Sequence, residues 1–179
     1  VTGYKKALPL LINGLEKLEY RGYDSAGIAI INPETKKISC SKAEGKLKNL
    51  INSIRNKKIP GSVGIGHTRW ATHGKPEVRN AHPHVDSSGK VAVVQNGIIE
   101  NYKDLKIKLE KEGIFFNSDT DTEVIPHLIQ RELSNLSKLK LENNGSTLLI
   151  AVRNVISDLE GSYALAVLWS GAPNSLVVA

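Results

Sequence analysis

The spacing of apolar residues along the chain predicts a mixture of amphipathic helices and buried strands. Leucine and isoleucine recur every three or four residues over 8–18 and over 47–54, which is the pattern of a helix with one buried face. Short apolar runs bounded by turn residues are typical of buried strands. By this criterion the strands are residues 26–31, 37–41, 63–68, 91–95, 163–169 and 176–179.

The remaining segments complete an irregular order of elements. Helical periodicity returns in residues 102–112, 122–133 and 148–159, whereas 69–90 is too rich in His, Pro and Gly for regular structure. Helix, hairpin, helix, strands, helices and strands follow one another without a regular strand–helix alternation. The order therefore predicts an α+β fold of layered sheets and helices, formed by residues 1–179 as one domain.

Composition and charge narrow the possible functions. Hydrophobic residues make up 40% and charged residues 23%, no apolar run is long enough to span a membrane, and no secretory signal is recognisable. A single cysteine, Cys40, cannot form a disulfide framework, so we expect a cytoplasmic protein. Much of the net charge of +6 comes from basic residues in 36–58, but no aromatic residue lies between Tyr23 and Trp70. We therefore expect a solvated basic face rather than a nucleic-acid site.

Three polar clusters carry candidate chemistry. Arg69 follows a buried strand, where its guanidinium can bind a carboxylate through two parallel hydrogen bonds, and Trp70 offers an apolar face beside it. Taken alone, such a pair is more often a surface arginine and a core tryptophan. Asn96 and Gly97, at a strand end, form either a turn or a pair of N–H donors for a developing oxyanion. Asp121 either belongs to the start of a helix or receives a substrate ammonium group.

Together, these polar blocks resemble a known family. Residues 18–27 (LEYRGYDSAG), 67–74 (HTRWATHG), 80–84 (NAHPH), 96–101 (NGIIEN) and 120–123 (TDTE) occur in order. They resemble the N-terminal glutaminase domain of the glutamine–fructose-6-phosphate aminotransferases, which are class II glutamine amidotransferases. The resemblance covers essentially the whole chain. It implies an N-terminal-nucleophile hydrolase fold, a four-layer αββα sandwich, which this chain would contain truncated at both ends.

The resemblance also implies how glutamine would be bound. Arg69 would bind the α-carboxylate of glutamine, with help from Thr72 and from the backbone around His73. Asp121 would accept the α-ammonium group. The two ends of the substrate zwitterion would thus be held by residues that lie about fifty positions apart in the sequence.

Further residues of the implied site act on the reaction itself. Asn96 and the backbone N–H of Gly97 would form the oxyanion hole, and Trp70 would gate a channel for ammonia. His82 lies in a shared motif, but no chemical role for it can be derived from the sequence. Gln95 replaces the histidine that usually precedes Asn-Gly, which puts the contact of that side chain in question.

The implied reaction hydrolyses glutamine to glutamate and ammonia. Sugar-isomerase domains, which these 179 residues lack, would pass the ammonia to fructose 6-phosphate and make glucosamine 6-phosphate. The full-length protein is expected to be a homo-oligomer. No metal and no other cofactor is implied, and neither a nucleic acid nor a membrane is expected as a partner.

The family's nucleophile is missing from this chain. It is a cysteine at the mature N-terminus, within a Cys-Gly-Ile-Val-Gly opening, whereas this sequence begins at Val1. Cys40 lies in a predicted strand, far in sequence from every site motif and without a neighbouring histidine, so we expect it to be structural. The fragment by itself is therefore expected to be inactive.

Three alternatives remain open at this point. The domain could belong to another class II amidotransferase, such as an amidophosphoribosyltransferase or an asparagine synthetase, although residues 20–27 argue against both. A metal-dependent hydrolase could use His67, His73, His82 and His84, but no matching carboxylate motif accompanies them. A glutamine-sensing module without catalysis would need Arg69 and Asp121 but no nucleophile.

Overall fold

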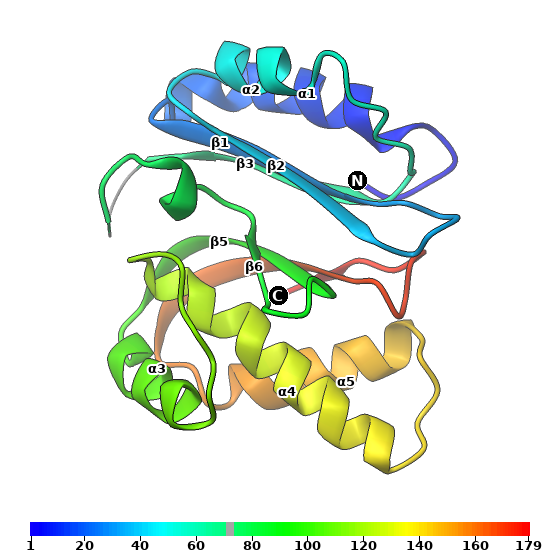
Figure 1. The fold of residues 1–179 in the computed structure, drawn as a ribbon, viewed down its shortest axis with the longest axis vertical. Helices are drawn as coiled ribbons and strands as arrows, with labels where there is room; N and C mark the ends of the chain where they lie inside the picture. Colours follow the sequence, from blue (N-terminus) through cyan, green and yellow to red (C-terminus); the bar gives the residue numbers. More distant parts are fainter. Residues whose placement is uncertain (71–73) are drawn as a thin grey trace.

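The computed structural model describes residues 1–70 and 74–179 and shows four layers (Figure 1). Two helices cover a three-stranded sheet of order β2-β1-β3, which faces a four-stranded sheet of order β4-β5-β6-β7, and three helices cover the far side. The helices are α1 (Ala7–Leu18), α2 (Leu47–Ile54), α3 (Tyr102–Lys111), α4 (Val124–Lys138) and α5 (Gly145–Ile156). The strands are β1 (Ser25–Ile31), β2 (Ile38–Glu44), β3 (Gly64–Arg69), β4 (His84–Val85), β5 (Val91–Ile99), β6 (Gly161–Trp169) and β7 (Val177–Val178).

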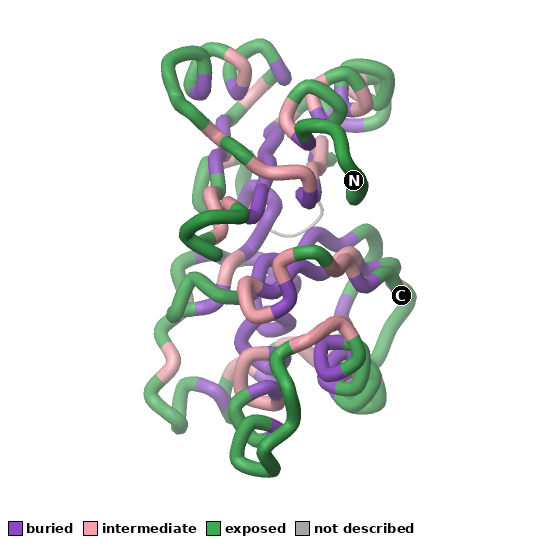
Figure 2. Tube along the Cα trace, turned by 90° about the vertical axis from the view of Figure 1, so that its right-hand side faces the viewer, coloured by how far each residue is buried: buried purple, intermediate pink, exposed green. Residues whose placement is uncertain are grey.

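Each central strand is buried on both faces, which explains its uninterrupted apolar sequence. In β1, Ile28 and Ile30 pack under α1 and α2, while Ala29 and Ile31 pack against the other sheet. The alternating side chains of β5 divide in the same way between the inner face and the layer of α3, α4 and α5. Figure 2 shows buried residues concentrated where the layers meet. Two-sided burial is what produces a continuous apolar run instead of an alternating one.

The layers confirm the α+β prediction, with corrections at four places. The segment 69–90 is not without regular structure, because it contains β4 and a short 3-10 helix, Val78–Asn80. Helix α5 begins at Gly145 rather than 148, since Asn144 caps it by accepting a hydrogen bond from the Thr147 N–H. Helix α4 continues to Lys138 rather than ending at 133.

The fourth correction concerns Asn96 and Gly97, which do not close a strand. Strand β5 runs through both residues to Ile99, and β6 pairs with it along the whole length. Gly97 has a φ of 117°, and a Cβ atom there would collide with the Ser162 carbonyl on β6. Only glycine suits this position, so the strand continues where an Asn-Gly pair usually turns.

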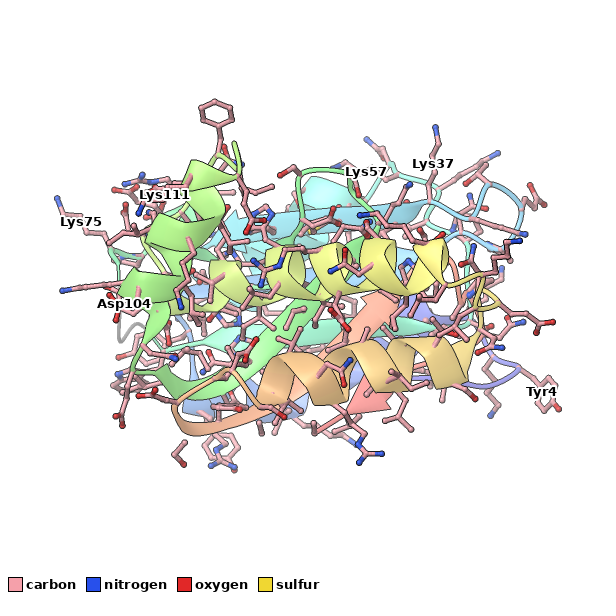
Figure 3. The ribbon with its side chains drawn as sticks, turned by 90° about the horizontal axis from the view of Figure 1, so that it is seen from below. Tyr4, Lys37, Lys57, Lys75, Asp104 and Lys111 are labelled. Carbon is pink, nitrogen blue, oxygen red and sulfur yellow. The ribbon has the colours of Figure 1, made fainter. Side chains whose placement is uncertain are left out.

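The basic residues of 36–58 are mostly exposed, as expected for a solvated face. Figure 3 shows the labelled Lys37 and, at the opposite end, Lys75 extending away from the ribbon. Across the described residues, no helix combines the length and the apolar character needed to cross a membrane.

One close backbone approach joins β1 to the segment before β4, near the site described below. The carbonyl of His82 passes over Gly27 of β1, where any Cβ would collide with it. Gly14, in α1, has open space around its missing side chain and provides a matched comparison.

We expect Gly27→Ala to lower the free energy of unfolding by about 1–3 kcal/mol, because the His82 backbone must move to admit the methyl group. Gly14→Ala should instead raise it by about 0.5–1 kcal/mol through helix propensity. Urea unfolding followed by circular dichroism measures both values. Equal stability of the two variants would contradict the proposed contact.

Candidate active site

A cavity of about 530 Å³ opens beside the C-terminal end of β3 and the second half of β5. It takes residues from both sheets and from a 3-10 helix, Asp121–Glu123, that precedes α4. Five residues predicted from the sequence line it together: Arg69, Trp70, Asn96, Gly97 and Asp121. Thr72 and His73, which were also predicted for the site, lie outside the described residues.

Arg69 is held at one side of this cavity by the loop that follows β3. The residue is 4% exposed, and its guanidinium donates hydrogen bonds to the carbonyls of Gly74 (3.3 Å) and Lys75 (3.5 Å). Asn80 secures that loop by donating to the Lys75 carbonyl and accepting from the backbone N–H of Asp119. Burial lowers the pKa of Arg69, but a guanidinium remains charged at neutral pH. The cavity therefore contains an oriented positive charge.

Asp121 supplies the opposite charge. Its carboxylate is buried and accepts a hydrogen bond from the Ile99 N–H of β5 at 2.7 Å. Burial lowers the pKa of Arg69, whereas the charge of Asp24 and then that of Asp121 raise it. A cavity that holds one buried cation and one buried anion is suited to a zwitterionic ligand, whose two charges can replace the lost solvation of both groups.

The edge of β5 that faces away from β6 presents backbone N–H groups to this cavity. The Gln95 N–H donates to His82 Nδ1 (3.2 Å), and the Ile99 N–H donates to Asp121. Backbone groups of alternate residues point to the same edge of a strand, so the N–H of Gly97 points the same way, between these two bonds. The Asn96 side chain is exposed to the cavity beside it. Two N–H donors from adjacent residues can thus reach one oxygen atom.

Trp70 lies at the rim, not in the core. It is 61% exposed and packs edge-to-face against Tyr23, with ring centroids 5.5 Å apart. The interpretation of Trp70 as a buried core residue is wrong, because its ring is mainly in contact with solvent. An exposed aromatic pair at the mouth of a cavity can cover a bound ligand.

The role of His82 and Gln95 was missed by the sequence, and the structure supplies one. His82 Nδ1 accepts from the Gln95 backbone, so its proton lies on Nε2, which faces Thr122 Oγ1 at 3.3 Å. The Thr122 hydroxyl then donates to Gln95 Oε1 at 2.8 Å. This closed circuit ties β5 to the start of the 3-10 helix. Residues 82, 95 and 122 are far apart in sequence, and only their polarity within otherwise apolar or buried segments could have indicated the circuit.

Three histidines next to the cavity, of which His82 and His84 are buried and His67 is half-buried, are held in the neutral form. Burial is the main cause that lowers the pKa of His67 and that lowers the pKa of His82 well below its usual value. For His84, burial followed by the charge of Lys42 lowers the pKa to about 3, although Glu123 acts in the opposite direction. Their ring nitrogens bond to side chains of β5 and of the 118–122 segment rather than converging on one point.

Cys40 lies away from this machinery. It is in β2, its Sγ is 4.0 Å from the Pro83 carbonyl, and it does not line the cavity. Packing around the thiol raises the pKa of Cys40, and nearby Lys42 offsets only part of this. A thiol with a raised pKa is a poor nucleophile at neutral pH.

The layers and the cavity define a class of protein. The structure is similar to that of the glutamine phosphoribosylpyrophosphate amidotransferase of B. subtilis, with a TM-score of 0.73 and 29% identity over 94% of this chain and 34% of that one. A second solved structure, described as the allosteric regulatory enzyme of purine biosynthesis, has a TM-score of 0.74 at 29% identity, over 96% of this chain and 34% of that one. The fold is thus that of the class II glutamine amidotransferases, which are N-terminal-nucleophile hydrolases. Residues 67–179 match the family described as "Glutamine amidotransferase domain", and the chain belongs to this family.

Curated relatives share about half of the sequence. The glutamine–fructose-6-phosphate aminotransferase [isomerizing] of Thermosynechococcus vestitus is 52% identical over 182 residues, covering 100% of this chain and 28% of its own length. That of Aquifex aeolicus is 49% identical over 176 residues, covering 98% of this chain and 28% of its own length. The chain therefore spans less than a third of the length of these relatives.

The neutral histidines predict a loss of stability in mild acid. Each has a folded-state pKa below its unfolded value of about 6.5, so each binds a proton on unfolding when the pH falls below about 6.5. The contribution of these histidines to the free energy of unfolding should be constant above this pH. Between pH 6.5 and 5 it should fall by up to about 1.4 kcal/mol per pH unit for each histidine.

Urea unfolding at pH 7.5, 6.5, 5.75 and 5 tests this expectation. Glu123 does not interfere, because hydrogen bonds outweigh its burial and lower its pKa to about 2, well under this range. His84→Gln keeps an N–H that can reach Thr120 and removes one titrating group, so its pH dependence should be shallower. The same slope in both proteins would show that His84 is not held neutral.

Proposed function

We propose that this domain binds L-glutamine in the cavity and is the glutaminase part of an enzyme that hydrolyses glutamine to glutamate and ammonia. The observation that carries the proposal is the placement of Arg69 and Asp121, buried and oppositely charged, in one cavity with Asn96 and Gly97. The guanidinium binds the α-carboxylate and Asp121 accepts the α-ammonium group. Thr72 and His73 assist Arg69 in this proposal.

The side-chain amide of the substrate then lies at the N–H donors of β5. Attack of a thiolate on the amide carbon forms a C–S bond and moves negative charge to the oxygen, which Asn96 and the Gly97 N–H stabilise. The C–N bond breaks as the nitrogen takes up a proton and leaves as ammonia. Water then hydrolyses the thioester to glutamate and restores the thiol.

The open edge of β3 indicates where a nucleophile could enter. Val1 and Gly64 exchange both backbone hydrogen bonds, which defines an antiparallel pair on the side of β3 that no strand of the described residues occupies. Residues joined before Val1 in the same register would run along β3, and the fifth would lie opposite Arg69. A Cys-Gly-Ile-Val-Gly opening, which the family resemblance implies, puts its cysteine at that position. The free α-amino group of this cysteine would act as the base.

Use of the ammonia in a synthetic reaction would require a longer polypeptide. The curated relatives are named for transfer to fructose 6-phosphate, and this chain covers about 28% of their length. We propose that the parent protein makes glucosamine 6-phosphate with sugar-isomerase domains, and that Trp70 at the rim gates the passage of ammonia. Formation of glucosamine 6-phosphate from glutamine and fructose 6-phosphate by the longer polypeptide tests this part.

Arg69 and Asp121 form a clamp for the two charged ends of glutamine, and this clamp predicts which substitutions weaken glutamine binding. Arg69→Lys keeps a charge but loses the bidentate geometry, and Asp121→Asn keeps an acceptor for the Ile99 N–H but loses the charge. Each should weaken glutamine binding about 10- to 100-fold, the usual effect of one charged hydrogen-bonding group. Isothermal titration calorimetry on the chain measures the Kd, and Arg55→Lys on the exposed end of α2 is the matched control. Unchanged affinity in both site variants would refute the clamp.

The register at β3 predicts the origin of activity. The chain beginning at Val1 should not hydrolyse glutamine, whereas the chain preceded by Cys-Gly-Ile-Val-Gly should release ammonia at a rate that an Ala-Gly-Ile-Val-Gly opening abolishes. Cys40→Ser should leave this rate unchanged. Turnover that requires Cys40 would overturn the assignment, and glutamine binding without turnover in the extended chain would favour a sensing module.

A further inference from the structure

The Asn96 side chain is not free to rotate, although it lies open to the cavity. Its Oδ1 is 2.8 Å from Nε2 of His67, which lies on β3 in the opposite sheet. An asparagine amide has an acceptor at one end and two donors at the other. With its oxygen bound to His67, the amide presents its N–H groups in the other direction, toward the cavity.

The proton of His67 must be on Nε2 for this bond to form, since Asn96 Oδ1 can only accept. His67 is neutral because burial lowers its pKa, with the nearby charge of Arg69 adding to this and that of Asp24 opposing it. A neutral imidazole carries one proton. Its Nδ1 is buried without a partner in the described structure, and a buried N–H there would be costlier than a lone pair. The Nε2–H form is therefore the favoured tautomer.

Packing determines the plane of the His67 ring. It stacks on His82, with centroids 4.5 Å apart and an angle of 24° between the rings. His82 is itself held by the hydrogen-bond circuit through Gln95 and Thr122 described above. Gln95, which precedes Asn96 in β5, thus holds His82 in place. His82 in turn holds the ring of His67, and His67 determines the direction of the Asn96 amide.

We propose that His67 is a positioning residue that orients the Asn96 amide toward the reacting oxygen, and that His82 holds His67 in place by stacking. The proposal rests on the proposed glutaminase function, in which Asn96 is an oxyanion donor. It differs from a purely structural role because it requires one tautomer of His67 and one orientation of one amide.

Nuclear magnetic resonance tests the geometry, first on the chain as it exists and then on its His67→Ala variant. In a ¹⁵N-labelled sample at pH 7.5, the imidazole nitrogens of His67 should report the Nε2–H tautomer. The side-chain NH₂ signals of Asn96 should be sharp, and in His67→Ala they should move toward the values of a freely rotating amide. An Nδ1–H tautomer, or Asn96 signals that His67→Ala leaves unchanged, would overturn the proposal.

A kinetic double-mutant cycle tests the consequence in the chain preceded by Cys-Gly-Ile-Val-Gly. His67→Ala should lower kcat about five- to tenfold, the usual contribution of one hydrogen bond, with KM unchanged. In an Asn96→Ala background, where kcat is already about 10²–10³-fold lower, the same change should have less than about a twofold effect. His67→Gln, which restores an N–H donor of similar reach, should recover most of the rate.

The outcomes separate the two proposals. Additive effects of His67→Ala and Asn96→Ala on kcat would refute the positioning role and leave the oxyanion role of Asn96 intact. An Asn96→Ala variant with normal kcat would refute the oxyanion role, and with it any catalytic role for His67. A rise in KM alone in His67→Ala would likewise count against positioning, because orientation of an oxyanion donor acts on the transition state.

Discussion

The site depends on the second half of β5, beyond Val93, being paired with another strand along one edge only. Strand β6 saturates that edge over nine residues, whereas beyond β4 the other edge is satisfied by side chains and not by a strand. A side chain can bond to one backbone group and leave the next one accessible, which a continuous ladder does not allow. The N–H of Gly97, between the groups bound by His82 and Asp121, is available to a ligand for this reason.

Burial then sets the charge of everything around that edge. Burial lowers the pKa of Arg69, but the charges of Asp24 and Asp121 raise it and backbone carbonyls accept hydrogen bonds from its guanidinium, so Arg69 keeps its charge. Burial disfavours the charged form of the histidines, and their protonation would also add positive charge next to Arg69 and Lys42. They are neutral, and a neutral imidazole has one donor and one acceptor. This directionality is what allows His67 and His82 to orient their partners.

Much of the fold could be predicted because two-sided burial leaves a clear record in the sequence, as in β1 and the first half of β5. The continuation of β5 could not, because whether Asn96-Gly97 turns depends on its pairing with Ser162 and Tyr163, over sixty residues later. Strand β4 was missed because two residues carry no periodicity and exist as a strand only through β5.

The residues of the candidate site also divide into those that the sequence predicts and those that it does not. Arg69 and Asp121 could be predicted from residue type and motif, and the structure places both in one cavity. The circuit of His82, Gln95 and Thr122 could not, because it depends on distances between three separate segments.

The open edge of β3 has a further consequence for how the domain behaves outside a larger protein. Backbone groups of alternate residues point to the same edge of a strand. Those of Gly66 and Thr68 therefore point, like those of Gly64, toward the edge at which Val1 pairs. Unpaired strand edges are templates for intermolecular β-pairing, which leads to aggregation or domain swapping. A segment that covers this edge would therefore act as a solubility element as well as a carrier of chemistry, and sequence changes along it would be constrained by both demands.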